Sequence, residues 1–132
     1  LHVVTPIKAD GRSRVEWDQA KAFAKAVCEQ VRDAAPDRYT TTLSKKARGG
    51  KIFLDYLRNG RMATAAAPWS ARARPGATIA FPLSWGQVRK GLDSKAFTLR
   101  TAPALLKKPD PWKDFRKGEI SLRPLLKKVG VE

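Results

Sequence analysis

Asp55 is a carboxylate inside the apolar run KIFLDYL, and every other charged residue from 39 to 92 is basic. Two-metal nucleotidyl transfer needs oxygen ligands that hold magnesium or manganese, and cations that clamp a triphosphate. Asp55 offers the first kind of group. The cations along this part of the chain are Arg48, Lys51, Arg58, Arg61, Arg72 and Arg74. The pattern predicts one half of such a site, because a lone aspartate cannot hold two metal ions.

Plainer interpretations fit the same residues. Spacing alone favours an ion pair between Asp55 and Arg58 or a neighbouring lysine, since structural pairs also bury carboxylates. Arg58 and Arg61 are typical of a solvated edge, although like charges that face each other favour an anion between them. His2 is typical of a core or edge histidine. The tryptophans could stack on bases, but their scattered positions favour core anchors: Trp17, Trp69, Trp85 and Trp112.

A strand over residues 51–58 is expected to position Asp55. Asn59-Gly60 then predicts a type I′ turn into a second strand over 61–67. This register sets Asp55 opposite Thr64. Because side chains alternate along a strand, Asp55 is predicted to point away from the face that packs on a helix and into a cleft.

A helix over residues 14–33 is the element expected to cover that strand pair. The sequence SRVE predicts a capping box in which Ser13 accepts from the backbone near Glu16. An apolar stripe at helical spacing follows: Ala20, Phe23, Ala24, Val27, Cys28 and Val31. Cys28 on this stripe is interpreted as a small core residue.

Other segments have simpler patterns. Alternating β-branched residues predict a strand over 1–7, and the cations and glycine pair of 40–50 predict a mobile basic loop. Residues 78–83 read as a strand, and 84–91 as a short helix capped by Ser84. Short helical pieces are expected within 97–115.

The composition limits the class of protein. A chain of 132 residues fits one domain, and its net charge of +15 predicts a polyanionic partner such as nucleic acid. Ten basic residues and one acidic residue lie between 44 and 90. Cys28 is the only cysteine, which excludes an intramolecular disulfide, and no long apolar run or signal peptide predicts a membrane. Motifs of P-loop, dinucleotide-binding and α/β-hydrolase enzymes do not occur.

The stretch KARGGKIFLDYLRNGRMATAAAPWSARARPGATIAFPLSW, together with LHVVTPI at the start, resembles the polymerase domain of bacterial ATP-dependent DNA ligase D. That domain belongs to the archaeo-eukaryotic primase superfamily. The resemblance runs from Leu1 to Phe115 and implies an α+β fold with a mixed or antiparallel sheet and helices on one face. Residues 1–132 would be the C-terminal portion of a single primase-polymerase domain. The start at Leu1 predicts an excised piece without the family's D-x-D motif.

The resemblance also implies roles for individual residues. Asp55 ends the motif IFLD and would be a catalytic carboxylate that binds Mn²⁺ or Mg²⁺. His2 and Arg72 would contact the triphosphate, and Arg48 would lie on a mobile loop near the primer end. The remaining cations would bind DNA: Lys45, Lys46, Lys51, Arg58, Arg61 and Arg74.

The implied parent enzyme adds nucleotides, ribonucleotides by preference, to DNA 3′ ends during non-homologous end joining in the bacterial cytoplasm, where it would be associated with the nucleoid. Its implied partners are DNA ends, nucleoside triphosphates, a Ku-type end-binding protein and the parent's own ligase domain. This chain alone is expected to be inactive without the D-x-D pair. Two alternatives remain open: a non-catalytic basic module that only holds nucleic acid, and a scaffold for a partner protein.

Overall fold

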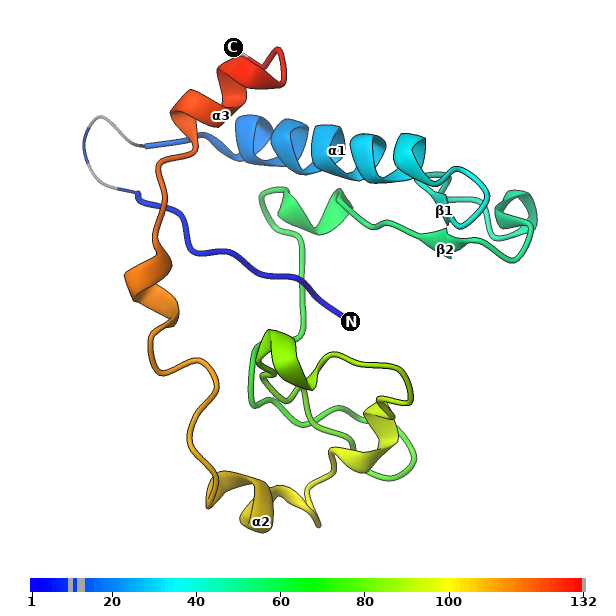
Figure 1. Ribbon diagram of the computed structural model, residues 1–132, viewed down its shortest axis with the longest axis vertical. Coiled ribbons are helices and arrows are strands. Elements are labelled where there is room, and N and C mark those ends of the chain that lie inside the picture. Colours follow the sequence, from blue (N-terminus) through cyan, green and yellow to red (C-terminus); the bar gives the residue numbers. More distant parts are fainter. Residues whose placement is uncertain (10, 12–13, 132) are drawn as a thin grey trace. The chain divides into compact units, whose positions relative to one another are not determined.

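The computed structural model describes residues 1–9, 11 and 14–131, which form two compact units (Figure 1). Unit 1 consists of Leu1–Pro6 and Ala65–Glu119, and unit 2 of Ile7–Thr64 and Ile120–Glu132. Helices and a small sheet occur together, which confirms the α+β class. No helix in the described residues is both long and apolar enough to cross a membrane.

Unit 2 is built on α1, the helix Trp17–Ala34. It begins three residues later than the predicted 14–33 helix, and Glu16 is its N-cap. The side chain of Gln19 accepts a hydrogen bond from the Glu16 backbone N–H at 3.1 Å, which satisfies one donor at the helix start. The predicted capping residue Ser13 lies outside the described residues.

The apolar face of α1 is only partly covered. Figure 1 shows α3 (Arg123–Lys128) and the 3₁₀ turn Leu57–Asn59 beside this helix. Within unit 2 the most buried apolar side chain is Leu122, which is 1% exposed, whereas Val31 on the predicted stripe remains 40% exposed. Helical spacing therefore located the packing face but not the depth of its burial.

The sheet of unit 2 is small and parallel. Strands β1 (Tyr39–Thr40) and β2 (Ile52–Phe53) pair with Tyr39 opposite Ile52 and Thr40 opposite Phe53. The prediction of a mixed or antiparallel sheet is wrong in this respect. The chain between the strands is a loop, as predicted, with one 3₁₀ turn at Lys46–Arg48.

The predicted hairpin does not form. Strand β2 ends at Phe53, and Gly60 has φ −101°, whereas a type I′ turn needs positive φ at both central residues. The carboxylate of Asp55 accepts a hydrogen bond from the Leu57 N–H at 2.9 Å, and this Asx turn bends the chain away from the strand direction. Thr64 therefore does not pair with Asp55.

The predicted strand over 1–7 is also wrong. Residues 1–6 have no regular secondary structure, and Leu1 is 84% exposed. Only Ile7 forms an isolated bridge, with Ile120, and Lys8 N–H donates to the Ile120 carbonyl at 3.0 Å. Alternation alone does not make a strand, because its backbone groups also need a partner strand.

Unit 1 is held by short elements and aromatic contacts. It contains α2 (Ala102–Leu106), which matches the predicted helical pieces, and a 3₁₀ turn at Trp85–Gln87 where the Ser84-capped helix was expected. The predicted strand 78–83 is reduced to isolated bridges from Thr78 and Ile79. Short 3₁₀ turns also occur at Ser94–Ala96 and Phe115–Gly118.

The tryptophans divide into two kinds. Trp69 meets Phe81 edge-on at 4.9 Å although it remains 39% exposed, and the partly buried Trp112 stacks on Phe115 at 4.7 Å. Trp112 also donates its indole N–H to the Leu83 carbonyl at 3.2 Å. Trp17 and Trp85 are 57% and 75% exposed, so the prediction that all four anchor a core is wrong.

Candidate functional site

Asp55 lies in the turn that follows β2 rather than on a strand. One carboxylate oxygen accepts from the Leu57 N–H at 2.9 Å, and the other lies 3.8 Å from the Nε of Arg58. The side chain is 39% exposed. The ion pair with Arg58 is therefore present, but an exposed pair at this distance contributes at most about 1 kcal/mol and leaves the second oxygen accessible.

The carboxylate of Asp55 is within electrostatic reach of α1. Burial raises the pKa of the Cys28 thiol, and the negative charges of Asp55 and Glu29 raise it further. The turn after Asp55 also packs on α1. The direction of the Asp55 side chain, away from the helix, stays a prediction, whereas the effect of its charge on Cys28 is one that the sequence pattern did not indicate.

The described residues do not by themselves fit a metal centre. No group of three or more histidine, cysteine, aspartate or glutamate side chains comes together among them. Magnesium and manganese favour octahedral oxygen ligation, and one carboxylate offers at most two of the six ligands. No D-x-D occurs in the sequence. Asp55 can be one ligand of a divalent ion but not a complete site.

Arg48 is engaged within its own loop. Its guanidinium lies 4.2 Å from the centroid of the Phe53 ring, and one Nη donates to the Leu43 carbonyl at 2.9 Å. Its Nε is buried and has no hydrogen-bond partner. Phe53 is thus a site neighbour that sequence spacing missed, because it approaches Arg48 only when β2 pairs with β1 and folds the loop back.

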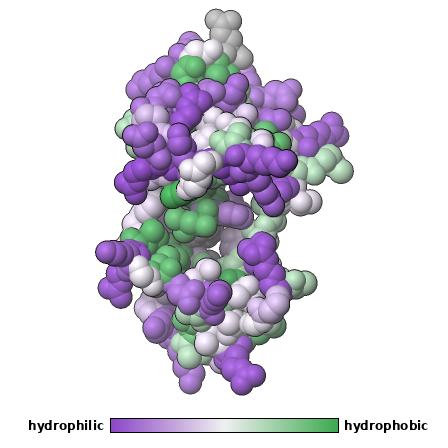
Figure 2. Space-filling model, turned by 90° about the vertical axis from the view of Figure 1, so that its right-hand side faces the viewer, coloured by the Kyte–Doolittle hydropathy of each residue, from purple (hydrophilic) through white to green (hydrophobic). Residues whose placement is uncertain are grey.

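The other cations of residues 45–61 are exposed. We name residues 45–61 the basic segment, since it carries six basic side chains and only Asp55 as an acid. Among the described residues, Asp55–Arg58 is the ion pair found within this segment. Its members with exposed positive groups are Lys45, Lys46, Lys51, Arg58 and Arg61. Hydrophilic side chains likewise cover much of the face shown in Figure 2.

The remaining predicted residues belong to unit 1. His2 lies in the exposed first segment. Arg72 and Arg74 are exposed cations on a tight turn that closes where the Arg72 N–H donates to the Thr78 carbonyl at 2.8 Å. Ala77 in this turn has φ +45°, a strained value for a residue with a Cβ. Of the predicted site residues, the structure brings Asp55 and Arg58 into direct contact.

Comparisons with known proteins agree on one family. The family model described as "LigD, primase-polymerase domain" matches residues 1–112. The multifunctional non-homologous end joining protein LigD of Pseudomonas aeruginosa is 32% identical over 118 residues, covering 87% of this chain and 14% of that protein.

Two further relatives have similar relationships to the chain. LigD of Mycolicibacterium smegmatis is 35% identical over 88 residues, covering 67% of this chain and 11% of the relative. The bifunctional non-homologous end joining protein LigD of Bacillus subtilis is 32% identical over 100 residues, covering 75% of this chain and 16% of the relative. The chain thus spans 11% to 16% of the length of these relatives.

Proposed function

This chain belongs to the LigD primase-polymerase domain family, and from that membership we propose that it is part of a nucleotidyltransferase that repairs DNA breaks by non-homologous end joining. The reaction would add nucleotides, ribonucleotides by preference, to a DNA 3′ end in the bacterial cytoplasm. The family match over residues 1–112 carries this proposal, because it includes both Asp55 and the basic segment.

Asp55 would act as one carboxylate ligand of a divalent ion, Mn²⁺ or Mg²⁺. The Asx turn supports this role, because the Leu57 N–H holds one oxygen in place while the other meets only the exposed Arg58. The other metal ligands would be further carboxylates, and the described residues place none of these close enough to Asp55 to complete a site.

The exposed cations would bind phosphate. A segment with Lys45, Lys46 and Lys51 unpaired in the described structure can release counterions when it meets a DNA backbone. Arg58, Arg61 and Arg74 would add to this contact.

Three residues are proposed to bind the incoming nucleotide. His2 and Arg72, both exposed, would contact the triphosphate. Arg48 would have to leave the Phe53 ring before it could reach a nucleotide. The macromolecular partners would be DNA ends, a Ku-type end-binding protein and the ligase domain of the same protein.

The test is Asp55→Asn in the full-length protein. Asparagine keeps a side-chain oxygen for the Leu57 N–H, so the turn is retained and only the charge is lost. We expect nucleotide addition to a DNA primer to fall by roughly a hundredfold or more, since metal-ion stabilisation contributes several kcal/mol. DNA affinity should stay the same or rise, because a negative charge leaves a basic segment.

Asp110→Asn is the matched control. Asp110 makes the same kind of turn, accepting from the Trp112 N–H at 2.8 Å, and it is exposed. Nucleotide addition at the wild-type rate by Asp55→Asn would refute the role of Asp55. Strong DNA binding without nucleotide addition by the wild-type protein would favour the non-catalytic module, and DNA affinity that is insensitive to salt would favour the scaffold.

A further inference from the structure

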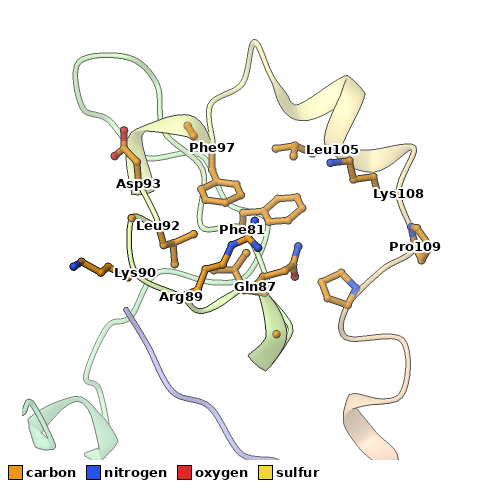
Figure 3. Close-up of a pocket in the computed structure, with 15 residues that line it drawn as sticks. Phe81, Gln87, Arg89, Lys90, Leu92, Asp93, Phe97, Leu105, Lys108 and Pro109 are labelled. Atoms are coloured by element: carbon orange, nitrogen blue, oxygen red, sulfur yellow. The ribbon is translucent and has the colours of Figure 1, made fainter.

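Unit 1 contains an open cavity that the proposed function does not use. Its volume is about 620 Å³, within the range of roughly 300–1,000 Å³ that is common for small-molecule sites. Figure 3 shows Phe81, Phe97, Leu92 and Leu105 around its interior. An apolar floor of this kind favours a ligand with a flat or apolar body.

The floor presents aromatic rings in a fixed arrangement. The rings of Phe81 and Phe97 stack at 5.0 Å with an interplanar angle of 16°. Trp69 meets Phe81 edge-on at 4.9 Å and supports that ring from another direction. Rings held in this way lose little conformational freedom when a further planar group stacks on them.

Cations line the rim of the same cavity. Arg89, Lys90 and Lys108 all belong to the lining, and Figure 3 shows Lys90 and Lys108 on opposite sides of it. Among the described residues, none of them has a carboxylate within salt-bridge distance. The acidic lining residue, Asp93, already accepts a hydrogen bond from the Lys95 N–H at 2.9 Å. The rim is therefore positive.

We propose that this cavity binds an unpaired nucleotide of a DNA single strand. The base would stack beside the rings of Phe81 and Phe97. The two phosphates that flank this nucleotide in the strand would contact Lys90 and Lys108 at opposite edges of the cavity. A strand that continues in both directions matches this arrangement better than a free nucleotide, whose phosphates all lie at one end. The identification of the strand as DNA rests on the proposed function.

Trp85 extends the surface beside the cavity. It belongs to the same 3₁₀ turn as the lining residues Gly86 and Gln87, and the residue is 75% exposed. An exposed aromatic ring beside a positive groove is typical of single-strand binding, because every base has a face on which to stack.

The test measures the affinity of the full-length protein for a labelled oligo-dT strand by fluorescence anisotropy, without metal ions or nucleoside triphosphates. Phe97→Leu should weaken binding roughly tenfold, since one stacked base is lost. Phe115→Leu is its control, because Phe115 also stacks on a neighbouring ring but lies outside the cavity. Thermal unfolding of both variants shows whether they are folded.

A second pair of variants, one in the cavity and one control, tests the proposal even if Phe97→Leu does not fold. Lys108→Gln should reduce the slope of log K against log salt by about 0.7, the value for one phosphate contact on a single strand. Lys107→Gln should not, because that exposed lysine does not line the cavity.

The proposal is overturned if Phe97→Leu and Lys108→Gln bind like their controls. It is also overturned if hydrogen exchange of residues 81–97 is slow without DNA and unchanged by it, because another part of the protein would then cover the cavity. The experiment measures DNA binding under conditions in which nucleotide addition does not occur. A failure here is therefore distinct from a failure of the Asp55→Asn experiment.

Discussion

Replacing Arg48 with alanine should open the loop between β1 and β2. The guanidinium stacks on Phe53 at 4.2 Å and donates to the Leu43 carbonyl at 2.9 Å, so one side chain ties both ends of the loop. Trypsin cleavage after Lys45 and Lys46 reports the open state, because both lysines lie between these contacts.

The magnitude follows from the interactions of the Arg48 side chain. The cation–π interaction contributes about 0.5–1 kcal/mol and the charge-assisted hydrogen bond about 1.5 kcal/mol. The buried Nε without a partner costs about 1 kcal/mol, and Arg48→Ala removes this cost as well. The net destabilisation of about 1–1.5 kcal/mol corresponds to a rise of roughly five- to tenfold in the open population.

The assay is the cleavage rate at low trypsin concentration, where cleavage tracks the open population. Phe53→Leu removes only the stacking and should raise the rate about two- to fivefold. Arg61→Ala removes a charge outside the loop and should leave the rate unchanged. Cleavage of Arg48→Ala at the wild-type rate would show that Arg48 does not hold the loop closed.

Two further predictions concern α1 and the buried core of unit 2. Asp55→Asn should lower the pKa of Cys28 and speed thiol modification at a fixed pH below that pKa, because a nearby negative charge disfavours the thiolate; the pKa should stay above its ordinary value, since burial is the larger cause. An unchanged pH profile of thiol modification would place Asp55 away from α1. Leu122→Ala should lower the free energy of unfolding by about 2–5 kcal/mol in denaturant titration, because this side chain is 1% exposed. Leu106→Ala, at a position 63% exposed, should change it by about 0.5 kcal/mol or less, and equal losses would contradict the assignment of the core.

Local patterns were sufficient where the interactions are local. The apolar stripe predicted α1 to within three residues at its start and one at its end, since helical hydrogen bonds join residues four apart. The helix at Ala102–Leu106 was also predicted, and at Ser84 the predicted helix start forms but continues only as the 3₁₀ turn Trp85–Gln87. The basic loop followed from composition in the same way.

Pairing between strands could not be predicted from such patterns. The Asn59-Gly60 dipeptide favours a hairpin, but the chain already leaves the extended conformation at the Asx turn of Asp55, four residues earlier. The strand that pairs with β2 is β1, which precedes the whole basic loop, and the pairing is parallel. Alternation in residues 1–6 likewise says nothing about whether a partner strand exists.

The sequence alone determined the charge of the chain, the family to which it belongs and the presence of a single carboxylate within the basic segment. These properties depend on residue types and their order. Only the tertiary structure decided that the turn after Asp55 packs on α1, that Arg48 rests on Phe53, and that Phe81 and Phe97 line a cavity with a positive rim. Those contacts join residues through packing and backbone turns, and sequence spacing does not encode which side chains will meet.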